Sequence, residues 1–404
     1  MNRRVAITGL GIISALGKNV AENWEALASG RCGIAPITIS DVSSLKFHNG
    51  AEVHGYDSGA FFEGNQADFL DRFAQFAVIA AREAISASGL DFHGELSDKT
   101  TIITGSSIGG QSSQDAGFWA VYHERQNRVH PLTIPRTMPN AGASAISMEF
   151  GIRGPAYNIS TACSSSNHAI GQAFWAVRSG LAEVAVTGGC EAPLSFGILK
   201  AWEAMRVVAP DTCRPFSRDR RGMILGEGAA VLVLEPFDAA RARGARILGE
   251  IVGFGMSSDA SHITKPAPEG AAAAIRKALD DAQLQPQQIG YINAHGTGTP
   301  VNDPMETSAI RGIFGAQADK IPVSSTKSMH GHALGAAGSL EAVATLMALS
   351  RCTLPPTANY TTPDPECDLD VIPNQARHAQ VEYALSNSFA FGGLNAVLAF
   401  RRAE

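Results

Sequence analysis

Cys163 occupies a stretch of chain that suits a nucleophile. It lies within TACSSSNHAIG, where a short run with β-branched residues, 157–161, breaks off and a small-residue helical pattern begins and continues to Gly180. The pattern places the cysteine at a helix N-terminus, where unpaired amides and the positive end of the helix dipole favour a thiolate. The same amides could hold an oxyanion. The alternative is a buried structural cysteine, the usual fate of a free cysteine.

Candidate partners of the cysteine stand in the second half of the chain. The segment IGYINAH predicts a buried strand with His295 at its C-terminal end, and catalytic groups of α/β sheets commonly lie beyond the carboxyl ends of strands. The segment SSTKSMHGHALGAAG predicts a polar turn with Lys327, His330 and His332, followed by a helix through Glu341. A cysteine, two histidines and a lysine could together supply a nucleophile with acid–base and oxyanion partners.

Three other chemistries fit these residues less well. His295, His330 and His332 have no carboxylate at ligand spacing and match no standard zinc pattern. Cys163 lacks the CGSCW surroundings of a papain-type protease. Near the N-terminus a predicted strand, 4–8, leads into the glycine-rich GLGIIS, which lacks the third glycine of a dinucleotide fingerprint.

The elements that would position these groups alternate between strands and small-residue helices. This alternation predicts a layered α/β fold. The pattern restarts near Ile247, so we expect two comparable halves, 1–246 and 247–404, that suggest an internal duplication. With 404 residues, 45% of them hydrophobic and 17% charged, the chain can bury a large core.

Charge and hydropathy exclude several classes of protein. A formal net charge of -6 without a basic cluster argues against nucleic acid and against a polybasic membrane contact. No apolar run of the length of a membrane span occurs, and glycines interrupt the apolar stretch at the N-terminus that superficially resembles a signal peptide. The six cysteines include no CxxC pair and look like reduced thiols. We therefore expect a cytoplasmic protein.

Four segments, in order and over nearly the whole chain, carry a specific resemblance. TACSSSNHAIG, NAHGTGTP, SSTKSMHGHALGAAG and NSFAFGGLNA resemble the motifs of β-ketoacyl-acyl-carrier-protein synthases of the type II elongating class. The segments KAWEAMR, APDTCRPFS, PPTANY and CDLDV look closer to the nodulation protein E branch. The resemblance implies a thiolase-like fold, with duplicated α/β halves in a five-layer αβαβα arrangement, and a homodimer.

The resemblance also implies an acyltransferase reaction. Cys163 would take an acyl chain from the phosphopantetheine of acyl carrier protein (ACP), so the enzyme needs no cofactor of its own. Malonyl-ACP would then bind and lose CO₂, and the carbanion would attack the thioester to give a chain two carbons longer. Imidazole N–H groups of His295 and His332 would stabilise the enolate, since donors aimed at developing charge lower its energy. Lys327 and Glu341 would orient and polarise His332.

Further roles carry over from the family to this sequence. The oxyanion amides would be those of Cys163 and Phe391, and two glycines would let the Phe391 gate move. The other residues implied in binding are Gly392 and Gly393 in the gate, Ile108 in the acyl pocket, Thr297 and Thr299 on the pantetheine arm, Asn293, Glu341, Ser386 and Asn387 near a monovalent cation, and Arg72, Arg125, Arg128 and Arg206 for carrier-protein docking.

The chain departs from the family where the gate is built. AFGGLN stands in place of the usual GFGGTN, so Ala390 and Leu394 predict altered chain selectivity or gating. His330 stands where a threonine is typical and Asn167 where a small apolar residue is. An active condensing enzyme, including one specialised for an unsaturated or polyene chain, is one reading. A non-condensing partner subunit like a chain-length factor, or a thiolase that uses coenzyme A, are the others. A partner subunit would normally have lost Cys163, and the histidine pair speaks against a thiolase.

Overall fold

The fold is organised by ten strands that divide into two sets of five. The computed structural model describes residues 3–404. The first set comprises β1 (Val5–Ser14), β4 (Thr100–Gly105), β5 (Ala156–Ile159), β6 (Val184–Glu191) and β7 (Gly228–Pro236). The second set comprises β8 (Gly249–Ser258), β9 (Ile289–Asn293), β10 (Val323–Ser324), β13 (Tyr383–Ala390) and β14 (Leu394–Arg402).

Both sets are connected in the same way. The first runs in the order β1-β7-β6-β4-β5 and the second in the order β8-β14-β13-β9-β10. In each set the first two pairings are antiparallel and the last two are parallel. The repeated order supports an internal duplication. The repeat begins at β8, next to the predicted boundary at 246/247, and the independence of the halves as domains stays a prediction.

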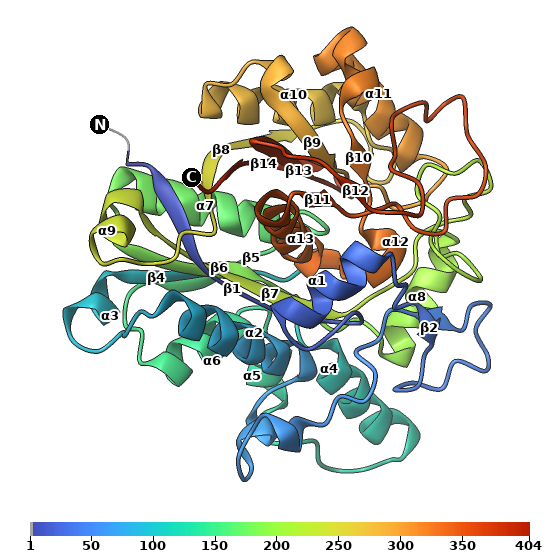
Figure 1. Ribbon diagram of the computed structural model, residues 1–404. Helices are drawn as coiled ribbons and strands as arrows, with labels where there is room; N and C mark the ends of the chain where they lie inside the picture. The colour runs from blue at the N-terminus through green and yellow to red at the C-terminus, as the bar shows by residue number, and fades with distance from the viewer. Residues whose placement is uncertain (1–2) are drawn as a thin grey trace.

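The two sets meet along their first strands and diverge from there. Residues 5–7 of β1 pair with residues 249–251 of β8, so the strands form one continuous ten-stranded sheet. Figure 1 shows the two parts of this sheet as separate layers with helices between and outside them. The thiolase-like α/β layering predicted from the sequence is confirmed.

Helices fill three of the five layers. Helices α2 (Arg72–Ser88) and α6 (Ala141–Phe150) cover the first sheet, and α10 (Pro268–Ala282) and α11 (Asn302–Phe314) cover the second (Figure 1). Helices α7 (Ser165–Ser179) and α13 (Ala337–Arg351) pack against each other between the sheets. Helix α7 follows β5 and helix α13 follows β10 along the chain, and β5 and β10 are the outermost strands of their sets. The duplication therefore brings the starts of two equivalent helices into the middle of the molecule.

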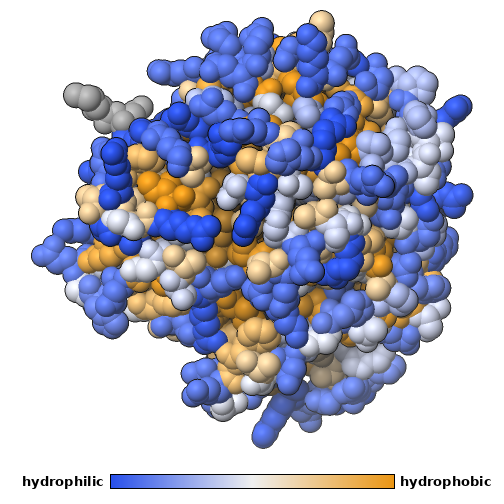
Figure 2. All heavy atoms as spheres, in the orientation of Figure 1, coloured by the Kyte–Doolittle hydropathy of each residue, from blue (hydrophilic) through white to orange (hydrophobic). Residues whose placement is uncertain are grey.

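Smaller elements connect these layers. They are α1 (Val20–Ser29), α3 (Glu95–Lys99), α4 (Gln111–Phe118), α5 (Thr133–Thr137), α8 (Phe196–Met205), α9 (Phe237–Ala242), α12 (Lys327–His330), β2 (Ala35–Pro36), β3 (Asn49–Gly50), β11 (Thr353–Leu354) and β12 (Arg377–His378). Within residues 3–404, the helices are too short or too polar for any of them to span a bilayer. Figure 2 shows hydrophilic side chains over α10 and α11 and hydrophobic patches lower on the same face.

Strand β1 is longer than the sequence predicted. The expected strand stopped at Thr8, whereas β1 continues through the glycine-rich segment GLGIIS to Ser14. The glycines serve close packing instead: a Cβ at Gly9 would lie 2.0 Å from the carbonyl oxygen of Ala84, and one at Gly11 would lie 2.0 Å from that of Ala80. Helix α2 thus rests directly on the strand backbone. The predicted end of the strand was wrong because only the packing of α2 reveals what the glycines are for.

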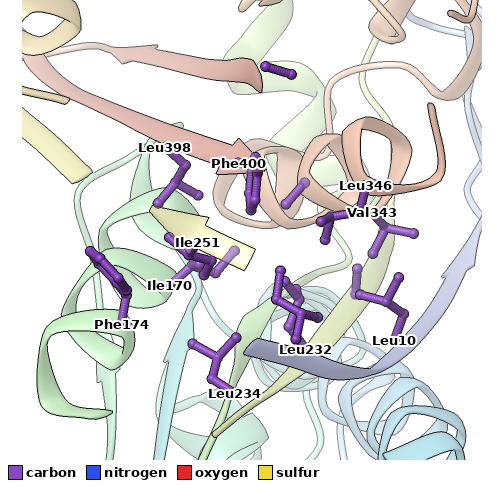
Figure 3. Packing of buried hydrophobic residues seen from close by; sticks show 14 of the residues in the cluster. Leu10, Ile170, Phe174, Leu232, Leu234, Ile251, Val343, Leu346, Leu398 and Phe400 are labelled. Carbon is purple, nitrogen blue, oxygen red and sulfur yellow. The ribbon is translucent and has the colours of Figure 1, made fainter. Parts of the chain in front are cut away.

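The core between the sheets is built from residues of both halves. Figure 3 shows side chains from α7, α13 and strands of both sets pointing toward one another. Its labelled members are Leu10, Ile170, Phe174, Leu232, Leu234, Ile251, Val343, Leu346, Leu398 and Phe400. Because burial of apolar area is the main favourable term in folding, this shared cluster fixes the two halves relative to each other.

Gly171 in α7 shows how tightly the central layer is packed. A Cβ there would lie 2.4 Å from the ring of Phe254 in β8. Alanine normally favours a helix over glycine by about 1 kcal/mol. We nevertheless expect Gly171→Ala to lower the free energy of unfolding by about 1–3 kcal/mol, since overpacking a dense core forces shifts of the neighbours.

Gly312 in α11 provides the matched control, because an added Cβ there meets open space. Gly312→Ala should raise the free energy of unfolding by about 0.5–1 kcal/mol. Denaturant unfolding curves of the two variants measure both effects. A Gly171→Ala protein as stable as the wild type would contradict the packing described for α7.

Candidate active site

Cys163 lies in the turn that joins β5 to α7. Helix α7 begins at Ser165 with Ser164 as its N-cap residue, so the cysteine directly precedes the helix as the sequence predicted. The turn places Ala162 in the left-handed region, at φ 51°, a conformation that costs energy for a residue with a Cβ. The Ser165 hydroxyl accepts a hydrogen bond, 2.9 Å long, from the Thr161 amide and thereby ties the turn to the helix. The sulfur is held on a tight, locally bonded loop.

The protonation state of Cys163 differs from the sequence-based expectation. Burial raises the pKa of the Cys163 thiol to about 12 and Glu191 also raises it, while Lys327 and the backbone amides of Phe391 and Cys163 lower it. The helix terminus was expected to produce a thiolate. That expectation was wrong for the resting protein, because removing the sulfur from water penalises its charged form more than the nearby positive groups favour it.

His295 follows strand β9 and is held by two polar contacts. Its backbone N–H donates to Glu306 Oε1 over 2.9 Å, and its ring Nδ1 lies 3.4 Å from Lys327 Nζ. A lysine ammonium has only donors, so Nδ1 acts as the acceptor and the neutral ring carries its proton on Nε2. The contact from Lys327 to His295 was not predicted from the sequence.

His332 comes from the turn before α13 and faces the first histidine. Its backbone N–H donates to the carbonyl of Ile224 over 2.7 Å, and its carbonyl accepts from the amide of Gly226 over 3.0 Å. The rings of His295 and His332 lie edge to face with centroids 5.4 Å apart. Two imidazoles from different turns therefore share one space.

A buried ion pair, Lys327 with Glu341 in α13, stands behind the histidines. Burial lowers the pKa of His295 and that of His332 well below the usual range, and the charge of Lys327 lowers both further. The expected influence of Lys327 on His332 thus acts through charge, while its hydrogen bond goes to His295. Both rings are neutral near pH 7, so they can donate hydrogen bonds from neutral imidazole.

These groups open onto one cavity of about 460 Å³. Cys163, His295 and His332 line it together with three of the residues predicted to bind substrate or gate it: Thr297, Thr299 and Phe391. The two threonine hydroxyls lie 3.0 Å apart. Gly393 also lines the cavity, whereas Ile108 packs against the apolar cluster that contains Cys163. The structure therefore brings the predicted nucleophile and both predicted donors to one substrate-sized space.

The gate segment is a tight hairpin turn between β13 and β14. Gly392 and Gly393 adopt φ values of 81° and 69°, which explains the two glycines. The Phe391 ring stacks on Trp202 of α8, with centroids 6.1 Å apart and planes 25° from parallel. Trp202 was not predicted from the sequence, since no local pattern indicates its contact with a residue so far along the chain.

The two departures from the family pattern face each other in this hairpin. Ala390 pairs with Leu394 across the turn. Both belong to the apolar cluster around Cys163. The substitutions thus lie where an acyl chain bound to the sulfur would be enclosed.

The predicted docking arginines divide into different environments. Arg72 donates to both carboxylate oxygens of buried Glu227, over 2.9 and 2.6 Å, and its side chain is 17% exposed. The guanidinium thus has a partner within the protein, and its docking role stays a prediction. Arg206 lines the cavity, together with two exposed cations that the sequence analysis missed, Arg221 and Lys265. Arg125 and Arg128 lie on an exposed segment, and their docking role stays a prediction.

The four residues predicted near a monovalent cation share unpaired buried oxygens. Ser386 pairs with Asn293 across β13 and β9. Among residues 3–404, no hydrogen-bond partner meets the side-chain oxygens of Asn293, Ser386 and Asn387 or Oε2 of Glu341. Neutral and anionic oxygens of this kind suit a hard cation. Asn167, another departure from the family, donates to the Ser386 carbonyl over 3.2 Å.

Fold and site together define a condensing enzyme of the thiolase-like class, in which a cysteine and two histidines act in one pocket between duplicated halves. Residues 2–240 match "Beta-ketoacyl synthase, N-terminal domain" and residues 248–361 match "Beta-ketoacyl synthase, C-terminal domain". The chain belongs to the β-ketoacyl synthase family and is an acyl-transferring condensing enzyme.

Relatives of known name match the chain over its full length. It is 48% identical to nodulation protein E of Rhizobium sp. (strain N33) over 402 residues that cover 100% of both chains. It is 40% identical to 3-oxoacyl-[acyl-carrier-protein] synthase 2 of Staphylococcus aureus (strain N315), over 100% of this chain and 99% of that protein. Both branches expected from the sequence motifs are therefore represented.

Solved structures agree with this assignment. The ishigamide ketosynthase/chain length factor superposes with a TM-score of 0.95 at 36% identity, covering 100% of both chains. A type II PKS acyl-carrier protein in complex with its ketosynthase bound to the hexaketide (AntDE:AntF) gives a TM-score of 0.91 at 30% identity, again over 100% of both chains.

The raised pKa of Cys163 predicts how its reactivity depends on pH. Because only the thiolate reacts, the alkylation rate of Cys163 by iodoacetamide should rise about tenfold per pH unit from pH 7 to 9, without a plateau. Mass spectrometry of the peptide that contains Cys163 separates its reaction from that of the other cysteines. A plateau below pH 8 would instead show that the resting enzyme holds a thiolate.

Proposed function

We propose that this enzyme extends an acyl group held on Cys163 by two carbons, in a decarboxylative Claisen condensation with malonyl-ACP. The observation that carries the proposal is the shared cavity, which Cys163 lines together with the neutral rings of His295 and His332. One cavity can then present a nucleophile and two hydrogen-bond donors to the same thioester.

The first step is acyl transfer to the cysteine. The sulfur of Cys163 attacks the acyl-ACP carbonyl, the tetrahedral oxyanion is stabilised by the amides of Cys163 and Phe391, and the pantetheine sulfur leaves as a thiol with the proton that the cysteine loses. The backbone amides of both residues lower the pKa of the Cys163 thiol, which supports this role. Fixed backbone donors of this kind need no reorganisation as charge develops.

The second step is decarboxylation of malonyl-ACP. Loss of CO₂ leaves the bonding electrons in an enolate whose negative charge sits on the thioester oxygen. The Nε2–H of His295, directed by the contact from Lys327 to Nδ1, and a ring N–H of His332 donate to that oxygen. The carbanion carbon then attacks the acyl group on Cys163, the C–S bond breaks, and the β-ketoacyl chain leaves on ACP.

We propose an acidic carrier protein as the partner that delivers both substrates. Arg206, Arg221 and Lys265 at the cavity are placed to meet its phosphopantetheine phosphate and acidic surface, and Thr297 and Thr299 can hydrogen-bond the arm. A similar ketosynthase has been solved with its acyl-carrier protein bound, which supports this partner. Pantetheine arrives with the substrate, so the enzyme itself uses no cofactor.

We propose that two copies of the chain form a homodimer through the edge of the first sheet. Strand β5 is the outermost strand of that set, and Tyr157 on it is 43% exposed. The nearby segment 118–134 also exposes large apolar side chains, including Phe118, Trp119, Tyr122 and Ile134. Exposed apolar residues in such number mark an interaction surface, and an open strand edge is a ready site of pairing. A chain-length factor in place of the second copy is the alternative, since some similar ketosynthases are paired with one.

The chain-specific residues favour a specialised acyl substrate over a housekeeping one. Ala390 and Leu394 place extra carbon in the apolar cluster beside Cys163, where the family usually has glycine and threonine. The high identity to nodulation protein E points the same way. An unsaturated or polyene chain is the alternative substrate class that these positions would select.

Asn293, Glu341, Ser386 and Asn387 would hold a monovalent cation in this proposal. Their unpaired buried oxygens fit such an ion, which would supply positive charge behind the catalytic residues. The ion takes no part in the transfer steps.

Acyl transfer predicts a covalent adduct on Cys163. Incubation of the enzyme with acyl-ACP should add one acyl group to the intact mass, and Cys163→Ala should abolish this addition. An adduct of undiminished yield in Cys163→Ala would remove the cysteine from its proposed role.

Enolate stabilisation predicts that the two half-reactions can be separated. His332→Ala should still form the acyl adduct, while CO₂ release from malonyl-ACP should fall about 100-fold, since loss of one such donor commonly has an effect of that size. Release of labelled CO₂ measures the step, and His93→Ala, with its ring at the surface, is the control. Normal CO₂ release in His332→Ala would refute the assignment of this histidine.

A further inference from the structure

Glu191 is a fully buried carboxylate beside the active site that the proposed mechanism does not use. It ends strand β6 and is 0% exposed. Within residues 3–404 it forms no ion pair with a lysine, arginine or histidine. A buried carboxylate is costly unless its oxygens are hydrogen-bonded, so the groups that bond to it are structurally committed.

Five donors from two distant parts of the chain converge on this carboxylate. From the turn after β4, the Ser106 hydroxyl donates over 2.9 Å, the Ser107 amide over 2.7 Å, the Ser107 hydroxyl over 2.6 Å and the Ile108 amide over 3.4 Å. From the second half, the Gly335 amide donates over 3.0 Å. Glu191 thus joins a turn of the first half to the segment that follows His332.

The two segments joined by Glu191 each supply an apolar side chain to the cluster around Cys163. Ile108 and Leu334 both pack in the hydrophobic cluster that contains the cysteine. Leu334 is held in the left-handed region at φ 44°, a strained conformation for leucine that its surroundings must maintain. Gly335 directly follows Leu334 in the chain, so the hydrogen bond from its amide to Glu191 holds the residue next to Leu334.

The approach of the two segments is too close for a side chain at Gly335. A Cβ there would lie 2.4 Å from the Ser107 amide nitrogen and 2.5 Å from Glu191 Oε2. A similar arrangement recurs in the second half, where buried Glu306 accepts from the amides of His295 and Gly296 over 2.9 and 2.8 Å. In the first half a carboxylate thus fixes the turn after β4, and in the second half a carboxylate fixes the turn after β9.

We propose that Glu191 is a positioning residue that sets acyl-chain selectivity. It fixes Ile108 and Leu334 relative to each other, and these two side chains form walls of the space that holds the acyl chain on Cys163. The proposal rests on the proposed function, in which Cys163 holds an acyl chain, and adds that this chain lies between Ile108 and Leu334. If these walls are rigid, they discriminate between acyl chains of different length according to how well the methylene groups of the chain fit between them. Loosened walls accommodate different chains more equally.

The negative charge of Glu191 provides a second readout, one that a purely structural role would not move. Glu191 raises the pKa of the Cys163 thiol, so removing its charge while keeping its shape increases the thiolate fraction. Ser107→Ala removes one donor and leaves the charge in place. The two variants therefore separate positioning from electrostatics.

The experiment compares wild type, Glu191→Gln, Ser107→Ala and a control, Glu83→Gln, in the full-length protein. Glu83 also accepts two backbone amides, those of Ile12 and Val20, but lies outside the catalytic cavity. Intact-mass kinetics give the ratio of Cys163 acylation by octanoyl-ACP to that by palmitoyl-ACP. Iodoacetamide labelling at pH 8 gives the reactivity of the thiol.

In Glu191→Gln the acylation ratio should move toward one by at least about threefold and alkylation should accelerate by at least about threefold. Ser107→Ala should shift the ratio in the same direction by less, without faster alkylation, and Glu83→Gln should match wild type in both. An unchanged ratio in Glu191→Gln overturns the proposal, even if alkylation accelerates. If Glu191→Gln does not fold, an unchanged ratio in Ser107→Ala overturns it. Absence of any adduct in wild type would instead refute the proposed function.

Discussion

The buried charge of Lys327 is the constraint on which the chemistry of the site depends. An ammonium with no exposed surface is stable only if it is paired, and Glu341 supplies the pair from the first turns of α13. Burial lowers the pKa of His295 and that of His332, and the charge of Lys327 lowers both further; the same charge acts against the burial that raises the pKa of Cys163. One cation, held by one carboxylate, therefore influences all three reacting groups.

The duplication explains how these groups come together. Each half places its last parallel strand before a central helix, and the two central helices pack against each other between the sheets. Cys163 precedes α7 and His332 precedes α13, so equivalent turns of the two halves carry the proposed nucleophile and one of the proposed donors. The helices can approach this closely because Gly338 of α13 lies at their contact, where a Cβ would be 2.4 Å from Asn167 Oδ1 of α7. The site is a product of the interface between halves.

Much of the fold and the central triad could be predicted from local sequence. Long motifs around Cys163, His295 and His332 combine a strand end, a glycine-rich turn and a helix start, and each of these has a short-range signature. Other features depended on remote contacts. Arg72 proved to be bonded to Glu227, and the Trp202 stack on Phe391 and the Glu191 hydrogen bonds join segments far apart in the chain.

Side-chain type and local spacing were enough to predict most strands and helices and the turns that carry Cys163, His295 and His332, and the motifs in those turns indicated the family. Which of these groups carry charge could be learned only from the folded protein. Cys163 was expected as a thiolate from its helix terminus, yet burial raises its pKa, and burial likewise makes the histidines neutral. Desolvation depends on everything packed around a group, and that environment is assembled from both halves of the chain.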